Sequence, residues 1–255
     1  MADLPDAVLS TSDRLADVLD SLLPIASQLP PDARDSVLPL LDSLLERLRL
    51  LAASLDLSVV PERWSFAGVE SIPDDRGLNV RHVFRRDTPA GTVTRLKCFG
   101  LVEGDAIERQ GEVLISAGPP PPGLTELESL AGTAPDQAAA RLKDAFASLR
   151  PAGARGDLET AVVDLYVLYW EQVRALWLEQ DATATARFDT GLDALLSVTF
   201  GIEPFHPVTF REHPEGWISC PPGTRMTTGR VTRTLRPGLR TAEGHLRLPA
   251  VVEAE

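Results

Sequence analysis

The side chains that could carry out chemistry do not gather into a catalytic or metal-binding pattern. The four histidines are scattered, and none has a cysteine or carboxylate at metal-ligand spacing: His82, His206, His213 and His245. The sequence has no Gly-rich phosphate loop, nucleophile elbow or HExxH helix. Cys98 and Cys220 do not form a disulfide framework in a chain of 255 residues, so we interpret them as small buried or half-buried residues. We therefore expect no enzyme, no catalytic residue, no metal and no cofactor.

The strongest pattern is instead an internal repeat, in which residues 91–117 and 229–255 align without a gap at an offset of 138. Eight of the 27 aligned positions are identical, where composition alone would give roughly two. These positions are Gly91/Gly229, Val93/Val231, Thr94/Thr232, Arg95/Arg233, Gly100/Gly238, Leu101/Leu239, Arg109/Arg247 and Val113/Val251. The repeat predicts a duplicated unit with an internal two-fold, and two-fold pairing is the commonest way in which proteins build interfaces.

Charge excludes one class of partner. The net charge of -12 and the pI of about 4.8 have the wrong sign for a protein that binds the phosphate backbone, so we expect no nucleic acid. Four arginines crowd one predicted hairpin, where they form either a solvated strand face or a local basic patch: Arg230, Arg233, Arg236 and Arg240. An oligonucleotide-binding β module is a third, weaker hypothesis that the acidic charge disfavours.

No segment has the pattern of a membrane span or a secretory signal. The longest apolar run, residues 161–178, is interrupted by Asp164, Glu171 and Arg174. The first residues lack the basic-then-apolar order of a signal peptide. We expect a soluble protein of the cytoplasm that does not contact a membrane.

The elements that must position any site are helices followed by short strands, and this order occurs twice along the chain. Apolar residues recur at spacings of three and four along residues 15–29 and 37–55, which is the heptad pattern of helices packed side by side. Residues 157–180 and 182–200 repeat this pattern, and residues 136–149 predict a further, surplus helix. Short β-type runs between Gly and Pro residues follow each helical region.

These patterns predict an α+β fold with five parts. They are a helical hairpin (1–57), a β domain (58–117), a Pro-rich linker (118–134), helices (135–200) and a second β domain (201–255). Two helical hairpins with one apolar face each can cover one another. We therefore expect residues 15–57 and 158–200 to form a four-helix bundle within one chain, with two small all-β domains attached.

The end of the second repeat carries the most specific motif. Gly238-Leu239-x3-Glu243-x2-Leu246-Arg247-x-Pro249-x-Val251 resembles the C-terminal signature of the GrpE family, the nucleotide-exchange factors of DnaK-type chaperones. In the first repeat Gly100, Asp105, Arg109 and Val113 fit the same signature. Residues 201–205 look like the segment that joins the bundle of that family to its β domain, and residues 68–72 do so in the first half of the chain. The resemblance covers roughly 80% of the chain.

The resemblance implies a co-chaperone in protein folding and the stress response that has no covalent chemistry. One β domain would hold open the ATPase domain of a DnaK-type chaperone, so that ADP leaves. This is a population shift, because the factor binds the open state more tightly. A fused duplicate would act as a monomeric pseudo-dimer. The alternative is a GrpE-derived adaptor or scaffold that binds a different protein partner.

The partner-binding residues implied for this chain come from both repeats. They are Arg109, Val113, Ile115, Gly100, Arg247, Val251, Gly238, Phe205 and His213. The two arginines either contact the chaperone or hold their own hairpins in place. The four repeat glycines are interpreted as turn residues with positive φ. Strand alternation puts Val113 and Ile115 on one face, whereas Glu253 replaces Ile115 in the second repeat, and the sequence does not decide which copy binds.

Overall fold

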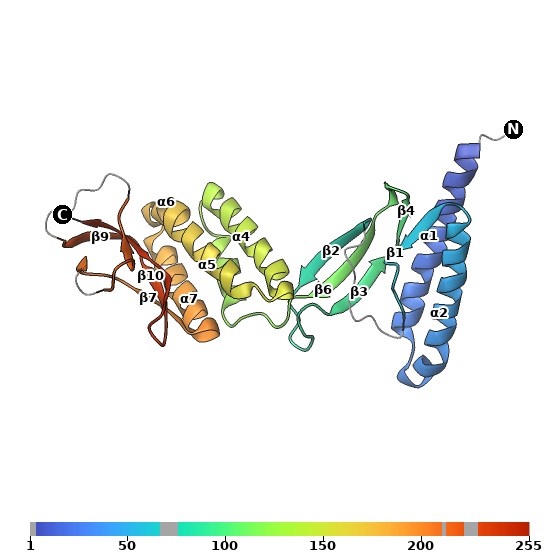
Figure 1. Cartoon of the computed structure of the whole chain (residues 1–255), viewed down its shortest axis with the longest axis horizontal. Helices are drawn as coiled ribbons and strands as arrows, with labels where there is room; N and C mark the ends of the chain where they lie inside the picture. Colours follow the sequence, from blue (N-terminus) through green and yellow to red (C-terminus); the bar gives the residue numbers. More distant parts are fainter. Residues whose placement is uncertain (1–3, 67–75, 211–212, 222–228, 255) are drawn as a thin grey trace. The chain divides into compact units, whose positions relative to one another are not determined.

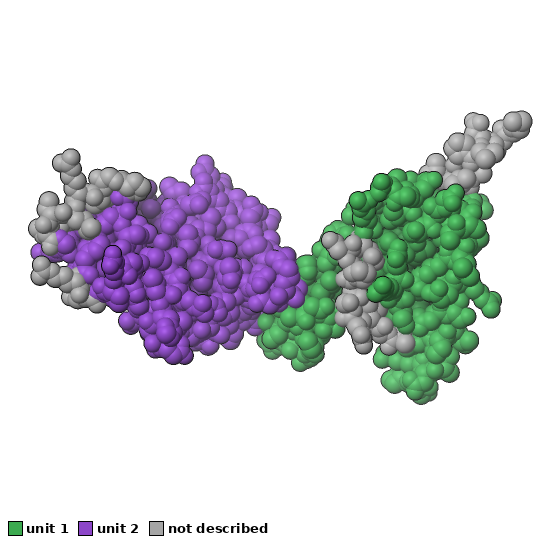
Figure 2. All heavy atoms as spheres, in the orientation of Figure 1, with its two compact units in different colours: residues 1–119 green, residues 120–255 purple. Residues whose placement is uncertain are grey.

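The structure is a computed structural model that describes residues 4–66, 76–210, 213–221 and 229–254, with no side-chain description for residues 4–10. The chain is α+β and divides into two compact units, residues 1–119 and 120–255 (Figure 2). Each unit combines helices with two small three-stranded sheets (Figure 1). In the described part of the chain, no helix has the length and apolarity needed to cross a membrane.

Unit 1 begins with a helical hairpin, α1 (Leu4–Gln28) and α2 (Pro31–Ala53). Pro31 stands at the first position of α2, where a missing N–H costs no helical hydrogen bond, so the two prolines end one helix and start the next. Leu15 and Leu19 of α1 and Leu45 of α2 are buried. The hairpin thus turns one apolar face toward the strands that follow it.

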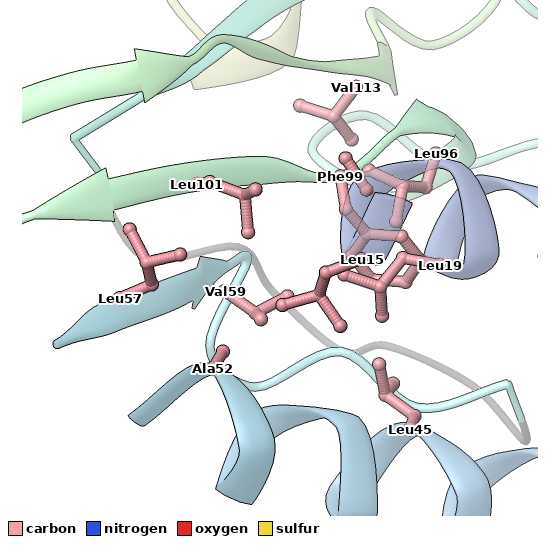
Figure 3. Packing of buried hydrophobic residues seen from close by; sticks show 11 residues of the cluster. Leu15, Leu19, Leu45, Ala52, Leu57, Val59, Leu96, Phe99, Leu101 and Val113 are labelled. Carbon is pink, nitrogen blue, oxygen red and sulfur yellow. The ribbon is translucent and has the colours of Figure 1, made fainter. Parts of the chain in front are cut away.

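Six strands form the β module of unit 1. They are β1 (Leu57–Val60), β2 (Leu78–Val83), β3 (Val93–Cys98), β4 (Gly100–Glu103), β5 (Ala106–Arg109) and β6 (Gly111–Ser116). One sheet has the order β1-β4-β5 and the other β2-β6-β3, with β2 parallel and β3 antiparallel to β6. Phe99 and Leu101 pack with Leu15, Leu19 and Leu45 in one core (Figure 3). Helices and module of unit 1 therefore share a single core.

Unit 2 has more helix than unit 1. Its helical elements are α3 (Leu124–Ala131), α4 (Asp136–Arg155), α5 (Leu158–Leu168), the π-helical turn η1 (Tyr169–Val173), α6 (Arg174–Gln180) and α7 (Ala182–Phe200). The region predicted as a Pro-rich linker thus contains α3, because Leu124, Leu127 and Ala131 lie on one helical face and are buried. Helix α4 also continues past Pro151 to Arg155 and is capped by Gly156, whose φ is 83°, so the predicted end at residue 149 was wrong.

The second β module repeats the first strand by strand. Its strands are β7 (Ile202–Phe205), β8 (Ile218–Ser219), β9 (Val231–Arg236), β10 (Gly238–Thr241), β11 (Leu246–Leu248) and β12 (Ala250–Ala254). The sheets have the orders β11-β10-β7 and β8-β12-β9, with β8 parallel and β9 antiparallel to β12. Strands β3 and β9, and β4 and β10, match at the offset of 138. The duplication seen in 27 residues therefore extends over the whole module.

The two β modules also correspond upstream of the sequence repeat, but through other residues than the sequence indicated. Val60 pairs with Gly100 and Phe205 pairs with Gly238, so β1 corresponds to β7. Asp56 (φ 59°) and Gly201 (φ 64°) hold the same left-handed place before these strands. Residues 68–72, which were aligned with 201–205, lie outside the described residues. The counterpart of 201–205 is 56–60, and Asp in place of Gly concealed it.

The helical stripe of α5 and α7 is covered within unit 2. Helix α4 packs against α5 and η1, and α3 packs against α7. The rings of Phe146 in α4 and Phe188 in α7 meet edge to face with centroids 6.5 Å apart. The face that the heptad pattern assigned to a partner hairpin is therefore occupied by helices of the same unit.

Candidate functional site

The two signature arginines bind carboxylates on the first helix of their own hairpins. Arg109 of β5 pairs with Asp20 of α1 and lies 3.9 Å from Asp17. Arg247 of β11 lies 3.0 Å from Glu159 of α5. In both units an arginine therefore fastens this strand to a helix, although the two arginines differ in register: Arg109 lies opposite Leu101, whereas Leu248, and not Arg247, lies opposite Leu239. This geometry matches the interpretation in which the arginines hold their own hairpins in place, and the partners are helix carboxylates.

Asp20 is the more constrained of these carboxylates. It also accepts a hydrogen bond from the Phe99 N–H at 2.9 Å, so it connects α1 with the residue between β3 and β4. Burial raises the pKa of Asp20, while the Phe99 N–H and the Arg109 guanidinium act in the opposite direction. A desolvated carboxylate of this kind holds its cation firmly, which makes Arg109 a positioning residue for the module.

The repeat glycines serve two different purposes. Gly91 and Gly229 have φ values of 78° and 71°, as expected for turns. Gly100 and Gly238 do not belong to the positive-φ glycines, and that part of the prediction was wrong. They begin β4 and β10 at points of close approach: a Cβ on Gly100 would lie 2.8 Å from the Gly111 nitrogen. Both are buried and are needed for strand contact.

Several of the apolar residues implied as partner contacts lie inside the modules. Val113 is fully buried in the core of unit 1, and Phe205 is 6% exposed in the core of the second module. His213 stacks on Trp217 at a centroid distance of 6.1 Å and lies 5.1 Å from the Phe205 ring. These residues support the shape of the modules. Val251 and Ile115 are half-buried and remain near the surface.

One sheet face of module 1 extends from the core to solvent. The register of β2, β6 and β3 places Val80 beside Val113, and places both His82 and Val93 beside Ile115. We call Val80, His82, Val93 and Ile115 the Ile115 face. Val80 is 38% exposed and the other three side chains are half-buried. The apolar surface of β6 therefore continues beyond Val113, where the helices no longer cover it.

The opposite face of the same sheet is polar. Glu112 of β6 accepts from Lys97 at 2.6 Å and pairs with Arg81 at 3.2 Å. The hydrogen bond from Lys97 is the main reason why the pKa of Glu112 is lowered. These three side chains satisfy one another, so the Ile115 face is the more suitable contact surface of this sheet.

The corresponding face of module 2 has a different character. The turn after β10 is one residue longer than the turn after β4, because Thr241 pairs with His245 whereas Glu103 pairs with Ala106, so the last two strands of module 2 are shifted by one residue from the offset of 138. The registers therefore place Ala254 where module 1 has Ile115, and Cys220, the residue after Ser219, where module 1 has Val80. Two large apolar side chains are replaced by smaller ones. The two copies therefore agree in strand order and differ in the chemistry of this surface.

Unit 2 contains a buried polar network that the sequence analysis did not find. The Tyr169 hydroxyl donates to Asp189 at 2.5 Å, and the Arg174 guanidinium binds the same carboxylate at 2.9 Å. Burial, with a smaller contribution from Asp189, raises the pKa of Asp193 to about 6. The guanidinium of Arg174 also lies 4.3 Å from the centre of the Trp170 ring. The network fixes η1 and α6 against α7.

The arginines at the second hairpin do not act as one basic patch. Arg236 is 6% exposed and donates to Glu171 of η1 at 2.9 Å, so it fastens β9 to the helices. Arg240 lies 3.9 Å from Glu203. Within the described ranges, no group of three or more His, Cys, Asp or Glu side chains is arranged to hold a metal ion. Cys98 and Cys220 do not form a disulfide, and burial raises the pKa of both thiols.

No protein-family model, curated protein or solved structure matches this chain.

Proposed function

We propose that this chain is a GrpE-like co-chaperone that binds the ATPase domain of a DnaK-type chaperone and promotes ADP release. One observation carries the proposal: a helical hairpin followed by a six-stranded β module occurs twice, and each module contains a signature arginine bound to the first helix of its hairpin. This is the plan that the sequence resemblance implies. Each module is proposed as a GrpE-like domain.

Module 1 is the proposed working copy, with the Ile115 face as its contact surface. Val80 and Ile115 offer apolar area to a partner, whereas the smaller Cys220 and Ala254 stand at the equivalent places of module 2. Complete burial of a Val or Ile side chain contributes about 1.5–3 kcal/mol. Since these two are already partly buried, each would add on the order of 1 kcal/mol on binding.

A binding free energy of this size is sufficient to promote nucleotide exchange without covalent chemistry. A factor that binds the open state of an ATPase domain better by about 1.4 kcal/mol raises the population of that state tenfold. Two apolar side chains that meet only the open state supply this difference. The β module would act as a rigid wedge, because its core is continuous with α1 and α2.

The test is the release of fluorescent ADP from the DnaK-type chaperone of the same organism. Val80→Arg should reduce the acceleration at least tenfold, because it places a charge on the apolar face. Cys220→Arg changes the equivalent place in module 2 and should leave the rate unchanged. Equal losses in both variants, with both proteins folded, would contradict the assignment to module 1.

A GrpE-derived adaptor with another protein partner is the second candidate. It is favoured by the signature arginines, since both bind their own helices in this structure and are not directed at a partner. The same assay separates the two functions. The adaptor function would be supported if this protein did not change ADP release from the chaperone, while Val80→Arg weakened its binding to another protein.

A further inference from the structure

The polar face of the sheet β2-β6-β3, opposite the Ile115 face, has the opposite charge to the chain as a whole. The three strands contain three basic side chains, Arg81, Arg95 and Lys97, and one carboxylate, Glu112, which gives a formal net charge of +2. The whole chain has a net charge of -12. A local surplus of one sign on a chain of the other sign attracts a partner of complementary charge.

Two arginines border one apolar residue in the middle of this face. Arg81 of β2 and Arg95 of β3 both lie beside Leu114 of β6, the central strand of the sheet (Figure 1). Neighbouring strands are about 4.8 Å apart, so the two arginine Cα atoms are separated by about 10 Å. The Arg81 side chain is 59% exposed, Arg95 is exposed and Leu114 is half-buried. We call Arg81, Leu114 and Arg95 the arginine row.

The carboxylate of Glu112 neutralises two of the basic side chains and not the third. It accepts a hydrogen bond from Lys97 at 2.6 Å and pairs with Arg81 at 3.2 Å. Among the residues that the structure describes, no carboxylate forms an ion pair with Arg95. The Arg95 guanidinium can therefore bind a carboxylate that comes from another molecule.

The equivalent arginine of module 2 has a carboxylate beside it within the chain. Arg233 is the repeat counterpart of Arg95, and the register places Glu253 next to Arg233, where Arg95 has Leu114. Opposite charges on directly paired strand residues attract one another. Module 2 thus supplies a carboxylate at this place from its own last strand, and module 1 does not.

We infer that the arginine row of module 1 binds an acidic segment of a partner protein, with one carboxylate on Arg81 and another on Arg95. A guanidinium group can bind a carboxylate through two parallel hydrogen bonds, and its charge does not depend on pH in the physiological range. In an extended segment, side chains two residues apart lie on one side at a separation of about 7 Å, which two long arginine side chains can span. The half-buried Leu114 side chain lies between them and offers an apolar contact to the carbon atoms of the segment.

The composition of the face favours a carboxylate partner over a nucleic acid. Strands β2, β6 and β3 contain no Phe, Tyr or Trp on which a base could stack. The net charge of the chain also repels a long phosphate backbone. A short segment with a few carboxylates meets only the local positive charge of this sheet.

The inference goes beyond the proposed function and does not rest on it. The arginine row and the Ile115 face lie on opposite sides of one sheet, so a chaperone and an acidic segment would occupy different surfaces. Arg95→Gln should weaken binding of the acidic segment and leave the acceleration of ADP release unchanged. Val80→Arg should reduce that acceleration and leave the acidic segment bound, which separates failure of one proposal from failure of the other.

The test is the binding of a dye-labelled peptide that alternates Glu and Val, measured by fluorescence anisotropy with the full chain. We expect saturable binding with a Kd below about 1 mM, and none for the same peptide with Gln in place of Glu. Arg95→Gln should weaken binding about fivefold, the upper range for one exposed ion pair. Arg233→Gln is the matched control in module 2 and should leave the Kd unchanged, because Glu253 lies beside this arginine.

A second variant transfers the module 2 arrangement into module 1. Leu114→Glu places a carboxylate between Arg81 and Arg95 and should weaken peptide binding about tenfold. Circular dichroism of each variant should show an unchanged fold, and Arg95→Gln alters only an exposed side chain.

Three results would overturn the inference. The first is an acidic peptide that shows no saturable binding to the wild type. The second is an equal loss of binding in Arg95→Gln and Arg233→Gln, which would mean that the charge of the whole chain and not the arginine row attracts the peptide. The third is an oligothymidylate that binds as tightly as the acidic peptide, which would identify a phosphate-binding surface instead.

Discussion

Replacing Arg109 by alanine should destabilise unit 1 more than the Arg247→Ala change destabilises unit 2. Arg109 is 32% and Asp20 is 23% exposed, whereas Arg247 and Glu159 are 50% and 40% exposed. Exposed ion pairs contribute about 0.2–1 kcal/mol, and a partly buried charge that loses its partner costs about 1–3 kcal/mol. With allowance for solvent screening, we expect a loss of about 1–2 kcal/mol for Arg109→Ala and about 0.5 kcal/mol or less for Arg247→Ala.

Hydrogen exchange measured by mass spectrometry on the full chain separates the two units. Peptides from residues 93–116 should exchange roughly 5–30 times faster in Arg109→Ala, while those from 231–254 stay unchanged. Asp20→Asn keeps an acceptor for the Phe99 N–H and removes the uncompensated charge, so adding it to Arg109→Ala should restore part of the protection. Equal losses in the two arginine variants, or no restoration by Asp20→Asn, would refute the reasoning.

Two further predictions concern packing and pH. Gly100→Ala should cost more than about 2 kcal/mol in a urea titration, because its Cβ would lie 2.8 Å from backbone atoms of Gly111 and Gly77; a variant as stable as the wild type would show that the strands can separate. Burial raises the pKa of Asp193 from 3.8 to about 6, so the folded state binds this proton more tightly and loses stability as the pH rises from about 4 to 6. Asp193→Asn should therefore be more stable than the wild type at pH 7 by about 1 kcal/mol, after allowance for solvent screening, and equal to it near pH 4. A stability difference between variant and wild type that is the same at both pH values in thermal melting would contradict this.

The β repeat was predictable because strand residues that must meet are close in sequence. The identities at Gly100/Gly238 and Val93/Val231 mark β4/β10 and β3/β9, and the structure confirms a second copy of the same module. The first strand of module 1 was missed, since its left-handed entry residue is Asp56 where the second copy has Gly201. A turn that tolerates Asp as well as Gly does not show in a search for glycine.

Helix α3 was hidden by the proline run that precedes it. Leu124, Leu127 and Ala131 have helical spacing, but eight residues are too few for periodicity to outweigh four prolines. Its place is decided by packing: a Cβ on Gly191 of α7 would meet a side-chain methyl of Leu127 at 2.9 Å. Tertiary contact of this kind is not encoded in local spacing.

The sequence could predict which residues share the candidate face, but not how far the core covers that face. Alternation put Val113 and Ile115 on one face, but the assignment of Glu253 to the place of Ile115 was wrong, because the longer turn of module 2 shifts the register and puts Ala254 there. Only the structure shows that the core covers Val113 and leaves Ile115 half-buried. The network around Asp189 was missed for a similar reason, because its partners come from a different helix, 15 and 20 residues away.

The most direct test of the central claim is the rate of ADP release from the organism's own DnaK-type chaperone, with and without this protein. The account predicts a clear acceleration that Val80→Arg removes and Cys220→Arg retains. No acceleration by wild-type protein that is folded, at concentrations well above that of the chaperone, would contradict the exchange-factor function.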